Sequence, residues 1–181
     1  MLLQREKACL LIVDVQEKLT PHVRQAELLV ARCGWLMRLA GELAVPLLVS
    51  EQYTRGLGQT VTPLRQWMPG LTDIDKVYFS CYRDASFVKH WKAVNKLQVV
   101  IAGIETHVCV LQTALDMQAA GVSVFVVVDA VSSRHALDHD VALTRMAQAG
   151  VHLITSEMVF FEWVGQAGTP EFKALSQGFL K

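Results

Sequence analysis

One of the four cysteines in this 181-residue chain stands where a thiol could act as a nucleophile. Cys109 lies in the stretch GIETHVCV, just after an apolar run that predicts a strand and in the first turn of a helical pattern over residues 106–120. If Thr106 caps that helix, the unpaired amides and the dipole of its first turn favour the thiolate. The alternative is a buried, inert cysteine, which is common in protein cores.

Two carboxylates end apolar runs that predict strands. Asp14 ends CLLIVD, and Asp129 comes near the end of VSVFVVVDA. Ligands of an open parallel sheet bind beyond the carboxyl ends of the strands. If the first and fourth strands are neighbours, as in the doubly wound order, Asp14 and Cys109 face the same crevice. Asp14 is then placed to accept the thiol proton.

The elements that must position these side chains follow an alternating pattern. Six apolar runs predict strands, at 9–14, 45–50, 76–80, 97–104, 122–130 and 151–155. Helical patterns cover 24–44, 85–95, 106–120 and 137–149, and the tail predicts two more helices within 156–181. This alternation predicts a three-layer α-β-α sandwich around a mostly parallel, six-stranded, Rossmann-like sheet, formed by a single domain over 1–181.

The segment 51–75 interrupts the alternation with several glycines and prolines, among them Pro69 and Gly70. Within it, TPLRQW predicts a short helix with Thr62 as its cap. So long a connection is either a loop that covers a site or a surface excursion packed by its own aromatic residues.

Composition and charge exclude several classes of protein. Seventeen basic residues balance seventeen acidic ones, which leaves no electrostatic footprint for nucleic acid. The apolar stretches are too short to span a bilayer, and the N-terminal run lacks the cleavage site of a signal peptide. The cysteines show neither disulfide nor zinc spacing, so we expect a cytoplasmic protein with reduced thiols.

Three stretches together resemble the isochorismatase-like cysteine hydrolases, the superfamily that includes nicotinamidase and N-carbamoylsarcosine amidohydrolase. They are LLIVDVQ, the lysine before VYFS, and GIETHVCVLQTALD, and the similarity continues through GVHLITSEMVFFE. The third stretch is most similar to the branch called isochorismatase-domain-containing proteins. The resemblance implies that Asp14 takes the thiol proton, that Cys109 is the nucleophile, and that Lys76 lies beside both and favours the thiolate.

The same resemblance implies a cis peptide bond between Ile104 and Glu105. The amides of Glu105 and Cys109 would then form an oxyanion hole. Isochorismatases proper resemble this chain but have glycine in place of Cys109, and their cleavage of a vinyl ether needs no thiol. We therefore expect a hydrolase that cleaves a carbon–nitrogen bond of a small amide through a thioester.

The chain departs from the nicotinamidases where they bind a metal. An aspartate and a histidine follow their second strand, whereas VSEQYTRGLG offers Glu51 alone. This predicts no metal and no cofactor, and it argues against nicotinamide as substrate. Glu105 either faces the substrate or pairs with an arginine. Further candidates for the substrate pocket are Gln16, Glu51, Tyr53 and Thr106.

The histidines offer less specific signals. His135 and His139 lie four residues apart and could form a metal pair, although polar neighbours favour a solvated first turn. His107 is expected to diverge from Cys109 on the helix. Cys81 is the rival nucleophile, and it would be the resolving cysteine if the chain were a thiol redox protein. A second alternative is a silent protein of this fold that binds a metabolite or a partner.

The tail is rich in aromatic residues, namely Phe160, Phe161, Trp163 and Phe172. They either cover the sheet or lie in a subunit interface. Because relatives form symmetric assemblies, we expect a homo-oligomer that acts on a small-molecule substrate.

Overall fold

The computed structural model describes residues 1–68 and 74–180; residues 69–73, which include Pro69 and Gly70 of the predicted loop, and Lys181 lie outside the described residues. Its sheet has six strands in the order β3-β2-β1-β4-β5-β6, and every pairing is parallel. The strands are β1 (Ala8–Val13), β2 (Leu47–Gln52), β3 (Ile74–Lys76), β4 (Gln98–Ile104), β5 (Ser123–Ser132) and β6 (His152–Ile154).

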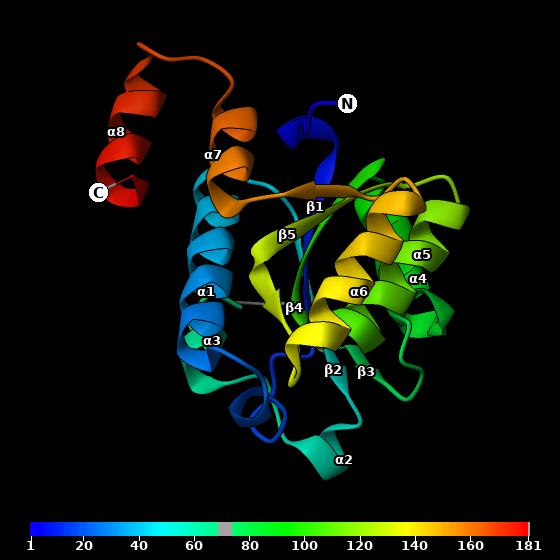
Figure 1. The fold of residues 1–181 in the computed structure, drawn as a ribbon. Helices are drawn as coiled ribbons and strands as arrows, with labels where there is room; N and C mark the ends of the chain where they lie inside the picture. The colour runs from blue at the N-terminus through cyan, green and yellow to red at the C-terminus, as the bar shows by residue number, and fades with distance from the viewer. Residues whose placement is uncertain (69–73, 181) are drawn as a thin grey trace.

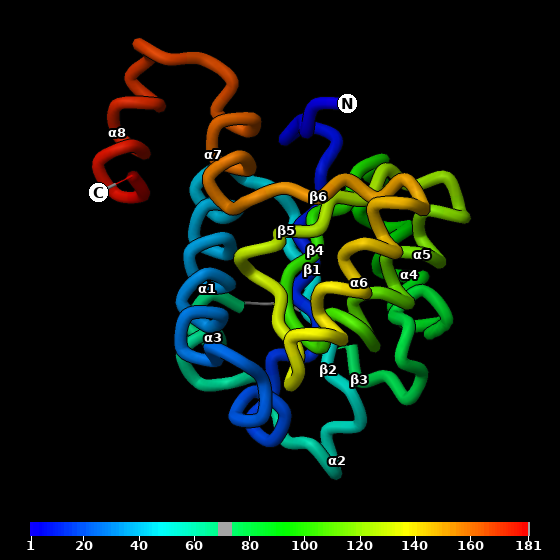
Figure 2. Tube along the Cα trace, in the orientation of Figure 1, coloured from blue at the N-terminus to red at the C-terminus, as the bar shows by residue number. Residues whose placement is uncertain are grey.

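Helices cover both faces of this sheet (Figures 1 and 2). On one side lie α1 (Ala26–Glu42), α3 (Thr62–Arg65), α7 (Ser156–Val164) and α8 (Pro170–Phe179), and on the other α4 (Ala85–Val94), α5 (Leu111–Ala119) and α6 (Ala136–Gln148). Successive strand residues enter opposite cores: Leu10 and Ile12 pack toward α1, whereas Leu11 and Val13 pack toward α5. Burial on both faces explains the continuous apolar runs. The predicted three-layer sandwich is confirmed.

Several short elements connect these layers. They are the 3₁₀ turns Arg5–Lys7, Thr20–His22 and Cys81–Arg83, the short helix α2 (Thr54–Leu57), and a π-helix over Thr106–Val110. The last of these leads directly into α5, so the predicted helix over 106–120 begins as a π-helical turn.

Three boundaries differ from the sequence prediction. The third strand is Ile74–Lys76 and not 76–80, because the chain bends after Lys76 and leaves Val77, Tyr78 and Phe79 exposed. Strand β5 continues to Ser132, so Asp129 lies inside it rather than at its end. The predicted short helix within 51–75 exists, but Val61 occupies its cap position, and Thr62 is its first residue.

A glycine fixes how closely β4 approaches β1 at the carboxyl edge of the sheet. Gly103 pairs with Val13 and has a φ of +117°. A β-carbon at this position would lie 2.1 Å from the carbonyl oxygen of Val13. Only glycine fits, and the close contact brings Asp14 and Ile104 to the same edge.

The tail aromatics pack on their own chain. Phe160 and Trp163 are fully buried in the core beside α1, and the ring of Phe160 lies 6.3 Å from that of Trp35. Phe161 alone of the four is largely exposed. Of the two interpretations of the tail, the structure supports a cover for the sheet and α1. No helix in the described ranges is long and apolar enough to cross a membrane.

Candidate active site

A buried ion pair lies at the carboxyl edge of the sheet. Asp14 follows β1 directly in a left-handed conformation, and Lys76 is the last residue of β3, two strands away. The Nζ of Lys76 lies 2.7 Å from Oδ2 of Asp14, and both side chains are fully buried. β2 lies between them, and its Ser50 donates a hydrogen bond of 2.7 Å to Oδ1 of Asp14.

The charge on Lys76 is maintained by its neighbours. Burial alone would lower the pKa of its ammonium, but the Asp14 carboxylate opposes this, and the net pKa is raised. Its Nζ also donates to Oε1 of Gln52 at 2.6 Å. The lysine is therefore protonated and held at two points.

Cys109 lies in the π-helical turn after β4. Its Sγ is 3.9 Å from Oε1 of Gln52, and the residue is 6% exposed at the surface of a cavity. Burial raises the pKa of the thiol strongly, and the Asp14 carboxylate raises it further, both by charge and as a hydrogen-bond acceptor. Lys76 lowers it, but by less. Lys76 thus favours the thiolate, in the direction that the resemblance implies, but burial and Asp14 outweigh it and the net pKa of the thiol is raised.

The cavity at Cys109 has a volume of about 380 Å³. Its walls come from the ends of β2 and β4 and from the loops around them: Leu19, Gln52, Leu57, Phe79, Glu105, His107, Val108, Cys109 and Arg134. Apolar walls with a few polar groups suit a small organic molecule.

Glu105 lines this cavity and also pairs with an arginine. The two alternatives predicted for its side chain, facing the pocket or pairing with an arginine, are therefore both present. Its Oε1 accepts from the guanidinium of Arg134 at 2.7 Å, and its Oε2 from the amide of the same residue at 3.1 Å. Burial alone would raise the pKa of Glu105, but the bonds from Arg134 outweigh it and lower the pKa. The peptide bond between Ile104 and Glu105 is cis.

Thr106 does not cap the helix. Glu105 occupies the cap position, and the hydroxyl of Thr106 lies 3.0 Å from Nδ1 of His139. Thr106 is fully buried and is not part of the cavity wall. His135 is exposed at the cap position of α6, in keeping with a solvated first turn, whereas the ring of His139 is bonded to Thr106.

The other expected pocket residues shape the loops around the cavity without lining it. Gln16 donates to the carbonyls of Gln52 and Gly58, and Glu51 accepts from the hydroxyl of Thr60 at 2.7 Å. Tyr53 is half exposed at the start of α2. Within residues 1–68 and 74–180, no group of three potential ligand side chains is placed to hold a metal ion.

Sequence reasoning missed several residues of the site. Gln52 and Ser50 are not among the predicted site residues. Both lie near the carboxyl end of β2, the strand beside β1, and ligands of a parallel sheet bind at that edge. His107 was expected to diverge from Cys109, yet both line the cavity. Both residues belong to the turn Thr106–Val110, which forms one wall of the cavity.

Two other predicted groups, Cys81 and Asp129, do not line the cavity. Cys81 is fully buried with its Sγ 3.4 Å from Oγ of Ser50, behind Asp14, and burial raises the pKa of its thiol to about 11. Asp129 accepts hydrogen bonds from the amide and the hydroxyl of Ser156 and lies 3.7 Å from Arg32. It binds Ser156, the first residue of α7, and does not line the cavity at Cys109.

A sequence model described as the Isochorismatase domain matches residues 8–158 of the chain. The chain is 39% identical over 173 residues to isochorismatase domain-containing protein 2A of Mus musculus, which covers 95% of this chain and 82% of that protein.

Solved structures share the whole fold. A structure of MAR1 ribonuclease from Caenorhabditis elegans superposes with a TM-score of 0.93 at 35% identity, over 100% of this chain and 93% of that one. YcaC from Pseudomonas aeruginosa, solved with hexane-2,5-diol and covalent acrylamide, gives 0.91 at 29%, over 99% and 92%. The YcaC gene product of Escherichia coli, an octameric hydrolase of unknown specificity, gives 0.89 at 28%, over 99% and 91%.

Proposed function

The chain belongs to the isochorismatase family, and from this premise we propose that it cleaves a carbon–nitrogen bond of a small amide through a thioester on Cys109. Family membership supports a hydrolase in general terms. The proposal for the reaction rests mainly on one observation: the thiol of Cys109 lines a cavity beside the buried pair of Asp14 and Lys76.

The first step is a coupled proton transfer and attack. Since the resting thiol is protonated, its proton passes to the Asp14 carboxylate as Sγ adds to the substrate carbonyl. Lys76 stays protonated and offsets the negative charge that develops around the sulfur. Ser50 and Gln52 hold the carboxylate and the ammonium in place.

The amides of Glu105 and Cys109 bind the oxyanion in this proposal. The carbon–nitrogen bond then breaks, and the leaving amine takes the proton from Asp14. A water molecule next adds to the thioester, Asp14 accepts one of its protons, and the carboxylic acid leaves as that proton returns to the Cys109 sulfur. The enzyme ends in its starting protonation state.

The covalent acrylamide in the Pseudomonas relative adds chemical support. Acrylamide is an electrophile that reacts readily with thiols, and it also carries a primary amide. Both properties suit a small, apolar-walled cavity that contains a cysteine.

Ammonia release from a panel of small primary amides and carbamoyl compounds tests the proposal. We expect turnover in the native protein, loss of turnover in Cys109→Ala, and full turnover in Cys33→Ala, since Cys33 is buried in α1 away from the cavity. Full activity in Cys109→Ala, or turnover of isochorismate alone, would contradict the thioester mechanism. Absence of turnover on every amide would favour the silent binding protein instead.

RNA is a second candidate substrate, because the relative from Caenorhabditis elegans is a ribonuclease by name. The balanced charge of the chain argues against tight binding of a polyanion. Incubation of a labelled RNA with native protein and with Cys109→Ala separates the two candidates. We expect no cleavage that depends on the native protein.

We also propose a homo-oligomer, by analogy with the octameric relative. The interface in this proposal is the apolar run Val77–Phe79, whose three residues are 69%, 54% and 53% exposed. The tail is less suitable, because most of its aromatic residues are covered by their own chain. A second copy would cover it beside the cavity that Phe79 lines. Light scattering should return a multiple of the 20.1 kDa chain mass, and Tyr78→Asp should lower it. A monomer at micromolar concentration would contradict the proposal.

A further inference from the structure

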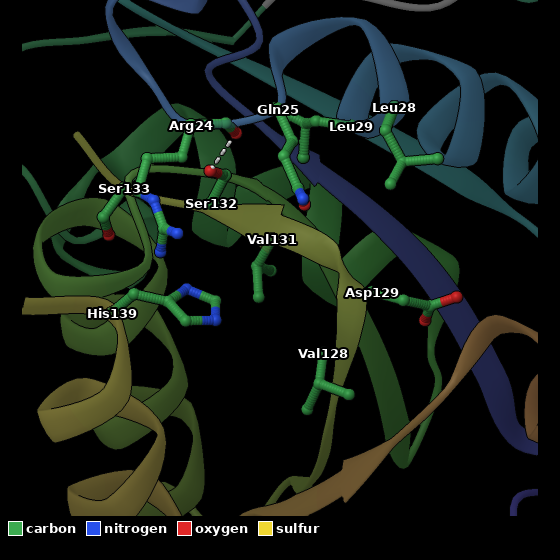
Figure 3. Close-up of a pocket in the computed structure, with 10 residues that line it drawn as sticks. All are labelled: Arg24, Gln25, Leu28, Leu29, Val128, Asp129, Val131, Ser132, Ser133 and His139. Atoms are coloured by element: carbon green, nitrogen blue, oxygen red, sulfur yellow. Dashed lines mark hydrogen bonds between the residues drawn. The ribbon is translucent and has the colours of Figure 1, made fainter. Parts of the chain in front are cut away.

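A second, smaller pocket lies beside the catalytic turn, between the start of α1, the end of β5 and the first turn of α6 (Figure 3). Its volume is about 150 Å³. Two contacts fix its frame: the amide of Arg24 donates to the carbonyl of Ser133 at 3.1 Å, and Ser132 Oγ donates to the carbonyl of Arg24 at 2.6 Å. The backbone on both sides of the pocket is therefore held in place.

A cation and an imidazole face each other across this pocket. Figure 3 shows the guanidinium of Arg24 extending toward the ring of His139, while the carboxylate of Asp129 points away from both. Asp129 is occupied by Ser156 and Arg32. Among the ion pairs of the described residues, none involves Arg24. Of the two charged side chains that line the pocket, Asp129 is therefore paired and Arg24 is not, within the described residues, so the pocket offers a cation that an anion can bind.

Arg24 and His139 also influence each other electrically. Burial lowers the pKa of the His139 imidazole; Asp140 on the same helix opposes this, and the charge of Arg24 adds a smaller lowering. A negative charge between Arg24 and His139 would accept a hydrogen bond from the guanidinium and would favour the protonated imidazole as a second donor.

We propose that this pocket is a binding site for a small anion of the carboxylate or inorganic phosphate type. Its size admits an ion of that kind and excludes a nucleotide or a peptide. This site goes beyond the proposed function, and its test needs no substrate for the enzyme.

The pocket is connected to the catalytic turn by two hydrogen bonds. Nδ1 of His139 lies 3.0 Å from the hydroxyl of Thr106, the residue that begins the π-helical turn of Cys109. Nδ1 of His107, which lines the catalytic cavity, lies 3.0 Å from Oγ of Ser133. An anion on Arg24 and His139 therefore acts on groups that position the turn around Cys109.

Titration of the protein with inorganic phosphate and with acetate, at constant ionic strength, tests the site. Amide shifts in NMR spectra should saturate and should cluster at Ser132, Ser133, His139 and Thr106. Arg24→Gln should weaken binding about tenfold, as expected when one charge-assisted hydrogen bond is lost. Arg145→Gln is the matched control, because it removes the same charge from the exposed far end of α6, and it should bind as the native protein does.

Shifts that do not saturate with either anion, or equal binding by Arg24→Gln and Arg145→Gln, would overturn the proposal. The connection to the catalytic turn has its own readout, the rate at which iodoacetamide alkylates Cys109. Anion should change this rate over the same concentration range in the native protein and in Arg145→Gln, whereas Arg24→Gln should need about tenfold more anion for the same change. A rate that the anion leaves unchanged in the native protein contradicts the connection.

Discussion

The ammonium of Lys76 and the carboxylate of Asp14 form a fully buried ion pair, with 2.7 Å between Nζ and Oδ2. Hydrogen bonds from Ser50 and to Gln52 complete the pair. A buried pair adds little net stability, but removal of one partner leaves an uncompensated charge in the interior. The site is therefore sensitive to single substitutions in a way that surface pairs are not.

Lys76→Met should lower the free energy of unfolding by about 3–5 kcal/mol, the usual cost of one unpaired buried charge. Adding Asp14→Asn should recover part of this loss, because it removes that charge, and asparagine tolerates the left-handed backbone at position 14. Urea unfolding of native protein, both single variants and the double variant gives the coupling energy. Simple addition of the two single effects would contradict the pairing.

The pair of Glu105 and Arg134 should set the charge at the mouth of the Cys109 cavity. Arg134→Gln leaves the Glu105 carboxylate uncompensated, so Cys109 should react more slowly with anionic iodoacetate than with neutral iodoacetamide. We expect the rate with iodoacetate divided by the rate with iodoacetamide to be about fivefold lower than in the native protein, as for a partly screened charge. Glu105→Gln should raise the ratio. The ratio is informative because changes in thiol reactivity itself cancel.

Gly103→Ala should lower the free energy of unfolding by more than about 2 kcal/mol, because its β-carbon would meet the carbonyl of Val13. Gly41→Ala is the matched control: it lies in α1 with open space around it, and alanine there should be neutral or stabilising. Thermal unfolding of both variants checks this. Equal stability of the two variants would show that the close contact between β1 and β4 can relax.

Alkaline pH should destabilise the protein. Burial raises the pKa of the thiols of Cys9 and Cys33 to about 12, and that of Cys81 to about 11. In the unfolded chain a thiol has a pKa of about 8.5, so above that pH the folded state binds more protons than the unfolded state. The stability that the buried thiols contribute is fully present below that pH and is lost as the pH rises toward 11–12.

Each buried thiol should contribute a slope of roughly 1 kcal/mol per pH unit within this window. Urea unfolding between pH 8 and 10 measures the total slope. Cys33→Ala should lower the free energy of unfolding at every pH. It should also reduce the slope of that free energy against pH by the contribution of one thiol. An unchanged slope would contradict the assignment of the alkaline transition to these thiols.

The sheet could be predicted from the sequence because its strands are buried on both faces and read as continuous apolar runs. The pairing of β1 with β4 followed from the doubly wound order, and it places Asp14 and Cys109 at one edge. The prediction of the third strand was wrong for a physical reason. Val77 is apolar yet exposed, so the residues after Lys76 have the sequence pattern of a buried strand without being one. An apolar run alone does not distinguish a core strand from an exposed apolar surface.

The site was harder to predict than the fold because its details depend on contacts between distant segments. The charge of Glu105 is set by Arg134, and the position of Thr106 by His139, partners that lie 29 and 33 residues away. The protonation of Cys109 depends on the balance between burial, Asp14 and Lys76. A local pattern, such as a cysteine at a helix start, captures only one part of that balance.

Asp14→Asn should separate the reactivity of the thiol from catalysis. The carboxylate of Asp14 is the largest influence after burial that raises the pKa of Cys109, and Lys76 opposes it. Without that negative charge the thiol ionises more easily, so alkylation of Cys109 by iodoacetamide should be at least as fast as in the native protein. Amide hydrolysis should nevertheless be lost, because asparagine can neither take the thiol proton nor return it to the leaving amine. Mass spectrometry of labelled peptides gives the first rate, with buried Cys81 as an internal control that should stay unlabelled. If the variant lost both labelling and turnover, Asp14 would act by organising the site rather than as the proton acceptor. If it kept turnover, the thiol proton would have to leave by another route, and the proposed mechanism would be wrong.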